Sequence, residues 1–183
     1  MKRVIVLFLC VIMMAKSGCS EPMKGHRAAK QDASVQGNLV QESWNIRIAL
    51  TQSGLSQGIL EAEHGSEYKT KQGSEYHFDH TVKVMFFDSE ALPSIVITAE
   101  QAVIHDNWDI DFSGNVVMKS GDGVVMKTEH LQRSACDSII RSDRFVTISR
   151  QEETIRGEGF EGDQALKRYR IFRGNGEAFI RQK

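Results

Sequence analysis

Apolar residues recur at every second position along most of the chain from Gln41 onward. The first such run is Trp44, Ile46, Ile48 and Leu50, and later runs occupy residues 82–86, 95–99 and 139–148. A spacing of two places the apolar side chains on one face of a β-strand, whereas a helix repeats every 3.6 residues. The later runs are also rich in the β-branched residues that strands favour. The pattern therefore predicts an all-β domain.

Short turn-forming sequences separate the predicted strands. They are Ser53-Gly54, Gln72-Gly73 and residues 113–115, 121–123 and 174–176. Gly, Asn, Asp and Ser supply the backbone conformations that reverse a chain within a few residues. Turns at short intervals between runs of period two predict antiparallel hairpins.

A four-residue pattern recurs four times: an aliphatic residue, any residue, a small residue and a glutamate. The copies are residues 60–63, 97–100, 126–129 and 155–158, at spacings of 37, 29 and 29 residues. In a strand the aliphatic and small residues share one face and the glutamate points to the other. Stacked hairpins would therefore have one lined face and a solvated outer row of glutamates. This predicts an elongated, twisted antiparallel β-jelly roll, or β-taco, built from repeated hairpins.

The N-terminus resembles a secretory leader. Lys2 and Arg3 precede an unbroken apolar run of 12 residues, Val4 to Ala15. A helix needs about 20 apolar residues to cross a bilayer, so this run suits the h-region of a signal peptide. Residues 16–19, Lys-Ser-Gly-Cys, resemble a lipoprotein processing site, although such sites usually carry an aliphatic residue where the lysine stands. We predict a signal peptide or membrane anchor in residues 1–18, with Cys19 lipidated or the hydrophobic segment retained.

Composition divides the rest of the chain into two parts. Residues 19–40 are rich in Gln, Gly, Ala, Ser and charged residues and have no apolar period, which predicts a flexible linker. Residues 41–183 are long enough to form one domain with its own core. Cys136 is the only cysteine in that part, so the domain must fold without an internal disulfide. We expect it to be a buried or idle thiol rather than a nucleophile.

Charge and motifs argue against several classes of function. Without residues 1–18 the net charge is −4, because three of the 23 Lys and Arg are lost against 24 Asp and Glu. Nucleic-acid binding requires many phosphates to be neutralised, so no nucleic-acid partner is expected. His77, Asp79 and His80 are not expected to converge on a metal within a strand and turn. The repeated glutamates are expected to be surface residues. We predict no enzyme activity, cofactor or metal.

The C-terminal third resembles the closing motif of the LptC family. The resemblance lies in residues 140–148 and 155–160, and Tyr169-Arg170-Ile171 is similar to the final strand of that family. Weaker similarity extends it over residues 42–179. It implies a jelly roll with an apolar lumen, on the periplasmic face of the Gram-negative inner membrane. Family members receive lipopolysaccharide from an inner-membrane ABC transporter and pass it to a periplasmic LptA-like bridge.

Two sets of site residues follow from the pattern and the resemblance. The expected lumen residues are Ile46, Ile48, Leu60, Phe86, Ile97, Val116, Met126, Phe145 and Ile155. The expected partner edges contain Trp44 toward the transporter, and Arg144, Gly157, Phe160 and Tyr169 toward the bridge. A register slip of one residue would exchange the two sheet faces. The alternative function is a structural lipoprotein adaptor that pairs strand edges without binding lipid, and a homodimer through the same edges is also considered.

Overall fold

The computed structural model describes residues 37–151 and 153–178, with side chains up to Gly174. They belong to one compact unit, residues 36–183. The predicted leader, Cys19 and the linker up to residue 36 lie outside the described residues. The first strand begins at Asn38, three residues before the domain boundary expected from the sequence.

Every regular element in the described part is a β-strand, and all pairings are antiparallel, so the predicted fold class is confirmed. The strands are β1 (Asn38–Gln52), β2 (Leu55–Lys69), β3 (Ser74–Asp79), β4 (Val82–Phe87), β5 (Pro93–Ala99), β6 (Gln101–Ile104), β7 (Ile110–Ser120), β8 (Val125–Arg133), β9 (Ile139–Arg150), β10 (Glu153–Asp163), β11 (Tyr169–Ile171) and β12 (Asn175–Ala178). Within the described residues, no helix has the length and apolar character to cross a membrane.

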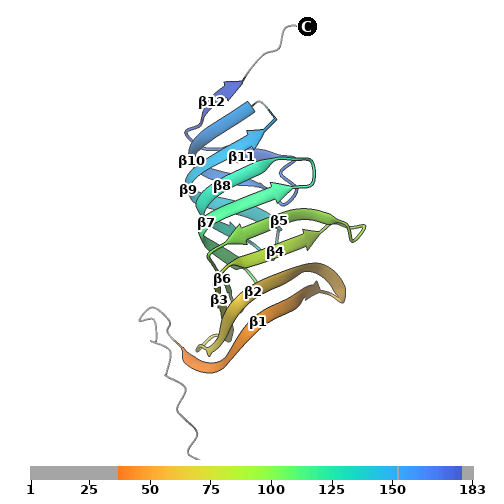
Figure 1. The fold of residues 1–183 in the computed structure, drawn as a ribbon, viewed down its shortest axis with the longest axis vertical. Helices are drawn as coiled ribbons and strands as arrows, with labels where there is room; N and C mark the ends of the chain where they lie inside the picture. Colours follow the sequence, from red (N-terminus) through yellow and green to blue (C-terminus); the bar gives the residue numbers. More distant parts are fainter. Residues whose placement is uncertain (1–36, 152, 179–183) are drawn as a thin grey trace, which may run out of the picture. The chain divides into compact units, whose positions relative to one another are not determined.

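The strands form one 12-stranded sheet that is folded on itself (Figure 1). The second half of β7 pairs with β5, whereas its first half pairs with β6. In the same way β2 pairs with β4 along one half and with β3 along the other. The long strands therefore belong to two facing arms. We call these the β4–β5 arm and the β3–β6 arm after the short strands that belong to one arm each.

The repeated four-residue pattern marks the corner between the arms. Its small residues, Ala62, Ala99, Thr128 and Gly157, are buried, and its glutamates, Glu63, Glu100, Glu129 and Glu158, are exposed. The inside of a bend has the least room, which accounts for the small side chains. Backbone conformations of positive φ occur at the same level, at Asn45 (53°), Gly114 (78°), Asn115 (46°) and Gly159 (87°). Bulges and left-handed residues bend a strand in this way.

The aliphatic members of the pattern lie in a continuous row on the inner face of the β4–β5 arm. The row also contains the apolar residues that lie between or beside them, and each residue is the direct cross-strand neighbour of the next. In order they are Ile48, Leu60, Val84, Ile97, Met118, Met126, Ile148 and Ile155. Directly paired residues on one face have Cβ atoms about 4.5–5.5 Å apart, so they pack against each other. We call this set the apolar row. It crosses eight strands from β1 to β10.

The opposite arm closes the core with aromatic residues. Phe78, Phe112 and Phe160 are at most 4% exposed and project from the inner face of the β3–β6 arm. In the centre of the apolar row, Leu60, Ile97 and Met126 are 0% exposed. The interior is therefore packed in its middle rather than hollow.

Phe145 was expected in the lumen, but this prediction is wrong. Its side chain is 56% exposed and its cross-strand neighbour is the exposed Glu158. Its chain neighbour Val146 is 0% exposed and occupies the inner position. The physical reason is that the turn joining β9 to β10 is one residue shorter than the turn joining β7 to β8, as the strand registers on either side show. Aligning the two repeats at a constant spacing therefore moves the assignment on β9 by one residue and exchanges its faces.

The predicted edge toward the bridge also needs correction. β9 is flanked by β8 and β10, and β10 is covered by β11 and β12, so Arg144, Gly157 and Phe160 are not on an outermost strand. Phe160 is a core residue that packs on Tyr169, with ring centroids 5.9 Å apart. Among the described strands the outermost are β1 at one end and β11 and β12 at the other. Trp44 on β1 and Tyr169 on β11 do lie there.

Candidate functional site

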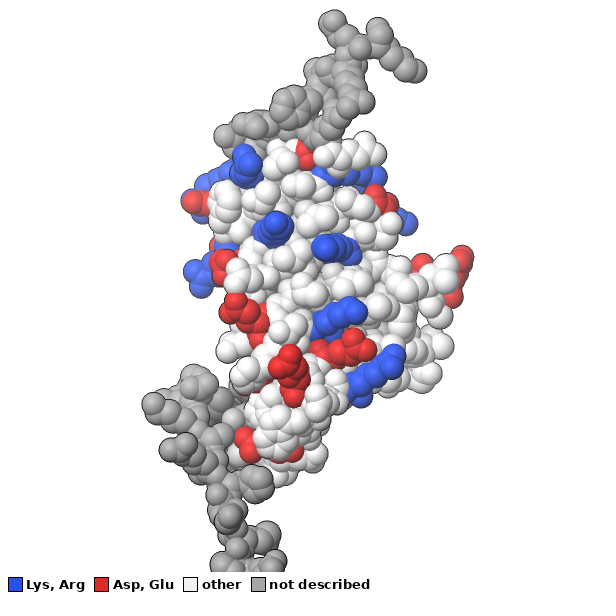
Figure 2. Space-filling model, viewed as in Figure 1, with Lys and Arg blue, Asp and Glu red and all other residues white. Residues whose placement is uncertain are grey.

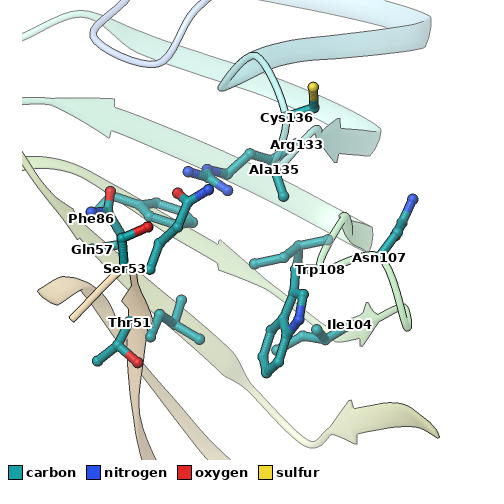
Figure 3. A pocket seen from close by; sticks show the side chains of 13 residues that line it. Thr51, Ser53, Gln57, Phe86, Ile104, Asn107, Trp108, Arg133, Ala135 and Cys136 are labelled. Carbon is teal, nitrogen blue, oxygen red and sulfur yellow. The ribbon is translucent and has the colours of Figure 1, made fainter. Parts of the chain in front are cut away.

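The folded sheet is open on the side opposite the corner, and a cavity lies there between the ends of the two arms, which we call their rims (Figure 3). The hairpin joining β1 to β2 and part of β4 form one wall, and the loops that follow β6 and β8 form the other. Its volume is about 430 Å³. Cavities of about 300–1,000 Å³ are typical of sites for small molecules. We call it the mouth cavity.

The inward-facing rows nearest the rims supply the walls of the mouth cavity. Leu50 and Phe86 come from the β4–β5 arm, and Ile104 and Ile110 from the β3–β6 arm. All four are buried, and Trp108 at the rim is 61% exposed. The cavity therefore offers an apolar surface that a ligand can reach from solvent.

One charged side chain lies among the lining residues, and it is Arg133 at the end of β8. It is 5% exposed and its guanidinium lies over the ring of Phe86, 4.5 Å from the centroid. Sequence reasoning missed this residue, although the period of two in Leu131-Gln132-Arg133 places it on the inner face with Leu131. The exposed Cys136 also lies at this cavity.

The remaining predicted lumen residues occupy the inner face with different exposure. Leu60, Phe86, Ile97, Val116 and Met126 are buried. Ile46 and Ile48 are partly buried against the core, and Ile155 is half-buried at the end of the apolar row. Phe86 alone among these nine reaches the mouth cavity. Their contact with a ligand stays a prediction.

Alternating histidines and carboxylates run across the outer face of the β3–β6 arm. His105 lies between Glu75 and Asp111, with Nδ1 to Oε1 of Glu75 at 3.2 Å and Nε2 to Oδ2 of Asp111 at 2.8 Å. Burial opposes the charge on His105, but these hydrogen bonds and charges outweigh it and raise the pKa of its imidazole. Burial likewise opposes ionisation of Glu75, but His105 and His77 lower its pKa overall.

We expect the raised pKa of His105 to make stability depend on pH. A group whose pKa is higher in the folded state stabilises the fold below its unfolded pKa, and this contribution disappears as pH rises through the folded value. The free energy of unfolding should therefore fall above about pH 6.5, the ordinary pKa of histidine. Urea unfolding from pH 5.5 to 8.5 should show a weaker pH dependence in His105→Asn than in wild type. Identical pH profiles would contradict the assignment.

The structure brings His64, Asp79 and His80 together near the corner of β2 and β3. Ligand atoms of His64, Asp79 and His80 all lie within 4.8 Å of one another. Oδ1 of Asp79 is 2.9 Å from Nδ1 of His64 and 2.5 Å from Nδ1 of His80. His77 instead faces Glu75. His77 and His80 therefore do not converge, as expected from the sequence. The unexpected member of the cluster is the distant His64, which the pairing of β2 with β3 brings beside Asp79.

Charges of both signs are scattered over the face of the sheet seen in Figure 2. Positive and negative side chains are intermingled, and neither sign forms a continuous patch in this view. This face does not offer the concentrated basic surface that nucleic-acid binding requires.

A single antiparallel sheet folded around an apolar interior and open along one side defines the β-taco class of jelly rolls. The chain belongs to the LptC-related family of lipopolysaccharide assembly, which matches residues 4–174. No curated protein matches the sequence significantly. Membership implies a role in lipopolysaccharide transport and assembly. The family is an inner-membrane-associated periplasmic transport component and is not known as an enzyme.

Proposed function

We propose that this protein is a periplasmic carrier that receives lipopolysaccharide from an inner-membrane ABC transporter and passes it to an LptA-like bridge. The observation that carries the proposal is the apolar row, which runs from strand to strand inside a sheet that is open on one side. Such a row presents similar apolar surface at each step from β1 to β10. An acyl chain could move along it without a large change in its surroundings.

Burial of acyl chains supplies the binding free energy in this proposal. Each methylene removed from water contributes about 0.8 kcal/mol. Because the centre is packed, the chains must enter at the mouth and separate the arms as they advance. Met118 and Met126 are direct neighbours in the middle of the row. Methionine is flexible and polarisable, so it can repack around a passing chain.

The outermost strands are the proposed contacts with partner proteins. An outermost strand has unpaired backbone groups that can accept a strand of another protein. We assign β1, with the 65% exposed Trp44, to the transporter, and β11 and β12 to the bridge. A lipid on Cys19, or the hydrophobic segment within residues 1–18 if it is retained, would anchor the chain at the membrane, and the residues between Cys19 and β1 would act as the linker.

Photo-crosslinking from phenylalanine positions tests the carrier function. A photoreactive phenylalanine analogue replaces Phe86 at the mouth, Phe112 in the interior or Phe145 on the outer face, in living cells. The exposures of these side chains are 1%, 0% and 56%. We expect lipopolysaccharide adducts from Phe86 and Phe112 that depend on cellular ATP, and none from Phe145.

The three positions form a matched set because the same residue type is replaced each time. Adducts from Phe145 alone would place the lipid on the outer face and contradict a carrier with an inner path. Absence of adducts at Phe86 and Phe112, in a protein that is folded and reaches the periplasm, would contradict lipid carriage.

The second candidate is the edge-pairing adaptor without lipid binding. The packed centre of the interior favours it, since Leu60, Ile97 and Met126 are 0% exposed. An adaptor needs its outermost strands and a stable core, but it needs no mouth. Crosslinks from Trp44 to a protein, together with no lipid adducts from the interior, would favour this alternative.

A further inference from the structure

The mouth cavity contains a cation without a close countercharge. Arg133 projects from β8 toward the opposite arm, where its guanidinium lies beside Phe86 (Figure 3). It is 5% exposed. Within the described part of the chain, no carboxylate lies within the 4.0 Å of an ion pair. Asp109 acts on it only from further away, and its Oδ1 accepts a hydrogen bond from the backbone N–H of Ala135.

Most of the hydrogen-bonding capacity of Arg133 is unused. Its Nε donates to Oε1 of Gln164 over 2.9 Å, which holds the plane of the guanidinium. A guanidinium has five N–H donors arranged as a fork that matches two oxygens of a phosphate or carboxylate. No other hydrogen bond joins it to a described residue. The N–H groups of the two terminal nitrogens are thus available to a ligand.

Stability does not explain an arginine at this position. Its cross-strand neighbours on the inner face are Ile110 and Ile140, so an apolar side chain would continue the row of the β3–β6 arm. Burial lowers the pKa of Arg133 and the negative charge of Asp109 partly offsets this. A buried charge without a close partner destabilises a fold, and apolar residues of similar size are often equally or more stable.

We propose that Arg133 binds the phosphate of a phosphorylated amphiphile whose apolar part rests on Leu50, Phe86 and Ile110. The mouth cavity is then a headgroup subsite, and the acyl chains continue from it into the interior. This inference rests on the proposed carrier function and adds the chemical group that the mouth selects. Two phosphate oxygens accept hydrogen bonds from the terminal nitrogens of Arg133, while its Nε keeps its hydrogen bond to Gln164.

Binding of purified full-length protein to three probes tests the proposal. The probes are lipid A with its phosphates, enzymatically dephosphorylated lipid A, and inorganic phosphate. The chain has two tryptophans, so a Trp44→Phe background leaves Trp108 at the mouth as the fluorescent reporter. Arg133→Met removes the charge at similar length. Arg47→Met, at a side chain 69% exposed, is the control.

We expect the Trp44→Phe protein to bind phosphorylated lipid A about tenfold or more tightly than the dephosphorylated form. Arg133→Met should lose this preference and still bind the dephosphorylated lipid, while Arg47→Met should keep it. The unfolding midpoint of Arg133→Met should equal or exceed that of wild type, which shows that the loss is not unfolding. Arg133→Lys should recover part of the preference, because it restores charge without the fork.

Four outcomes would overturn the inference, and the last of them would also contradict the carrier function. Equal binding of both lipids by the starting protein, or a preference retained in folded Arg133→Met, would overturn the role of Arg133 alone. If inorganic phosphate displaced lipid A at a concentration equal to that of the lipid, the site would be one for free anions, and the proposal of an amphiphilic ligand would be overturned. No binding of either lipid would contradict the proposed carrier itself. A phosphatidic acid that competes as well as lipid A would support the phosphate and assign it to phospholipids.

Discussion

Ile97→Ala should lower the free energy of unfolding by about 2–5 kcal/mol, the usual range for removing a large aliphatic side chain from a core. Ile97 is 0% exposed in the middle of the apolar row, between Val84 and Met118. Its neighbours belong to paired strands and cannot collapse into the space without breaking the sheet. Urea unfolding followed by circular dichroism measures the change.

Leu55→Ala is the matched control for this substitution. Leu55 is also aliphatic and lies on β2, but it is 68% exposed. Its replacement should change the free energy of unfolding by no more than about 0.5 kcal/mol. A loss in Ile97→Ala as small as that in Leu55→Ala would mean that the arms are not packed on each other in solution. Such a result would favour an open lumen.

Gly157→Ala should destabilise the protein by about 1–3 kcal/mol, because it overpacks a close contact. A Cβ at Gly157 would lie 2.3 Å from Cγ2 of Ile171 and 2.7 Å from the backbone oxygen of Phe172. Both atoms belong to the segment of β11 and its following turn, which would have to move away from β10. Hydrogen exchange should show faster exchange in residues 169–178 than in β4 and β5.

Gly121→Ala provides the corresponding control. A Cβ there would meet no atom closer than 3.7 Å, which is an ordinary contact. Its stability and exchange should remain close to wild type. Unchanged exchange of residues 169–178 in Gly157→Ala would show that these strands do not lie on β10 as described.

Period-two patterning was sufficient to predict the strands and much of the inner face. Residues two apart must share a face of a strand, so the repeat placed Leu60, Ile97, Met126 and Ile155 together. The register confirms that they lie in one row. This success depends on local geometry alone, which a sequence carries directly.

Exact turn lengths and long-range pairings were beyond such reasoning. Phe145 was misplaced because the turn between β9 and β10 is one residue shorter than the turn between β7 and β8, and a difference of one residue has no distinct sequence signal. β11 and β12 are three and four residues long, too short to show a period, so the cover over Gly157 was missed. The meeting of His64 with Asp79 depends on the register of β2 against β3. Arg133 was passed over because a charged residue is rarely assigned to an inner face.

The folded sheet adds strands one after another, with most pairings between neighbours in the stack. Folding free energy in such an arrangement is largely a sum over neighbouring interfaces. The terminal strands have fewer interfaces than the central ones and are expected to open first. A partner strand added at an end would supply the missing interface. Partner binding and local ordering would then be one thermodynamic event, and the terminal strands would be fully ordered only when a partner strand is paired with them.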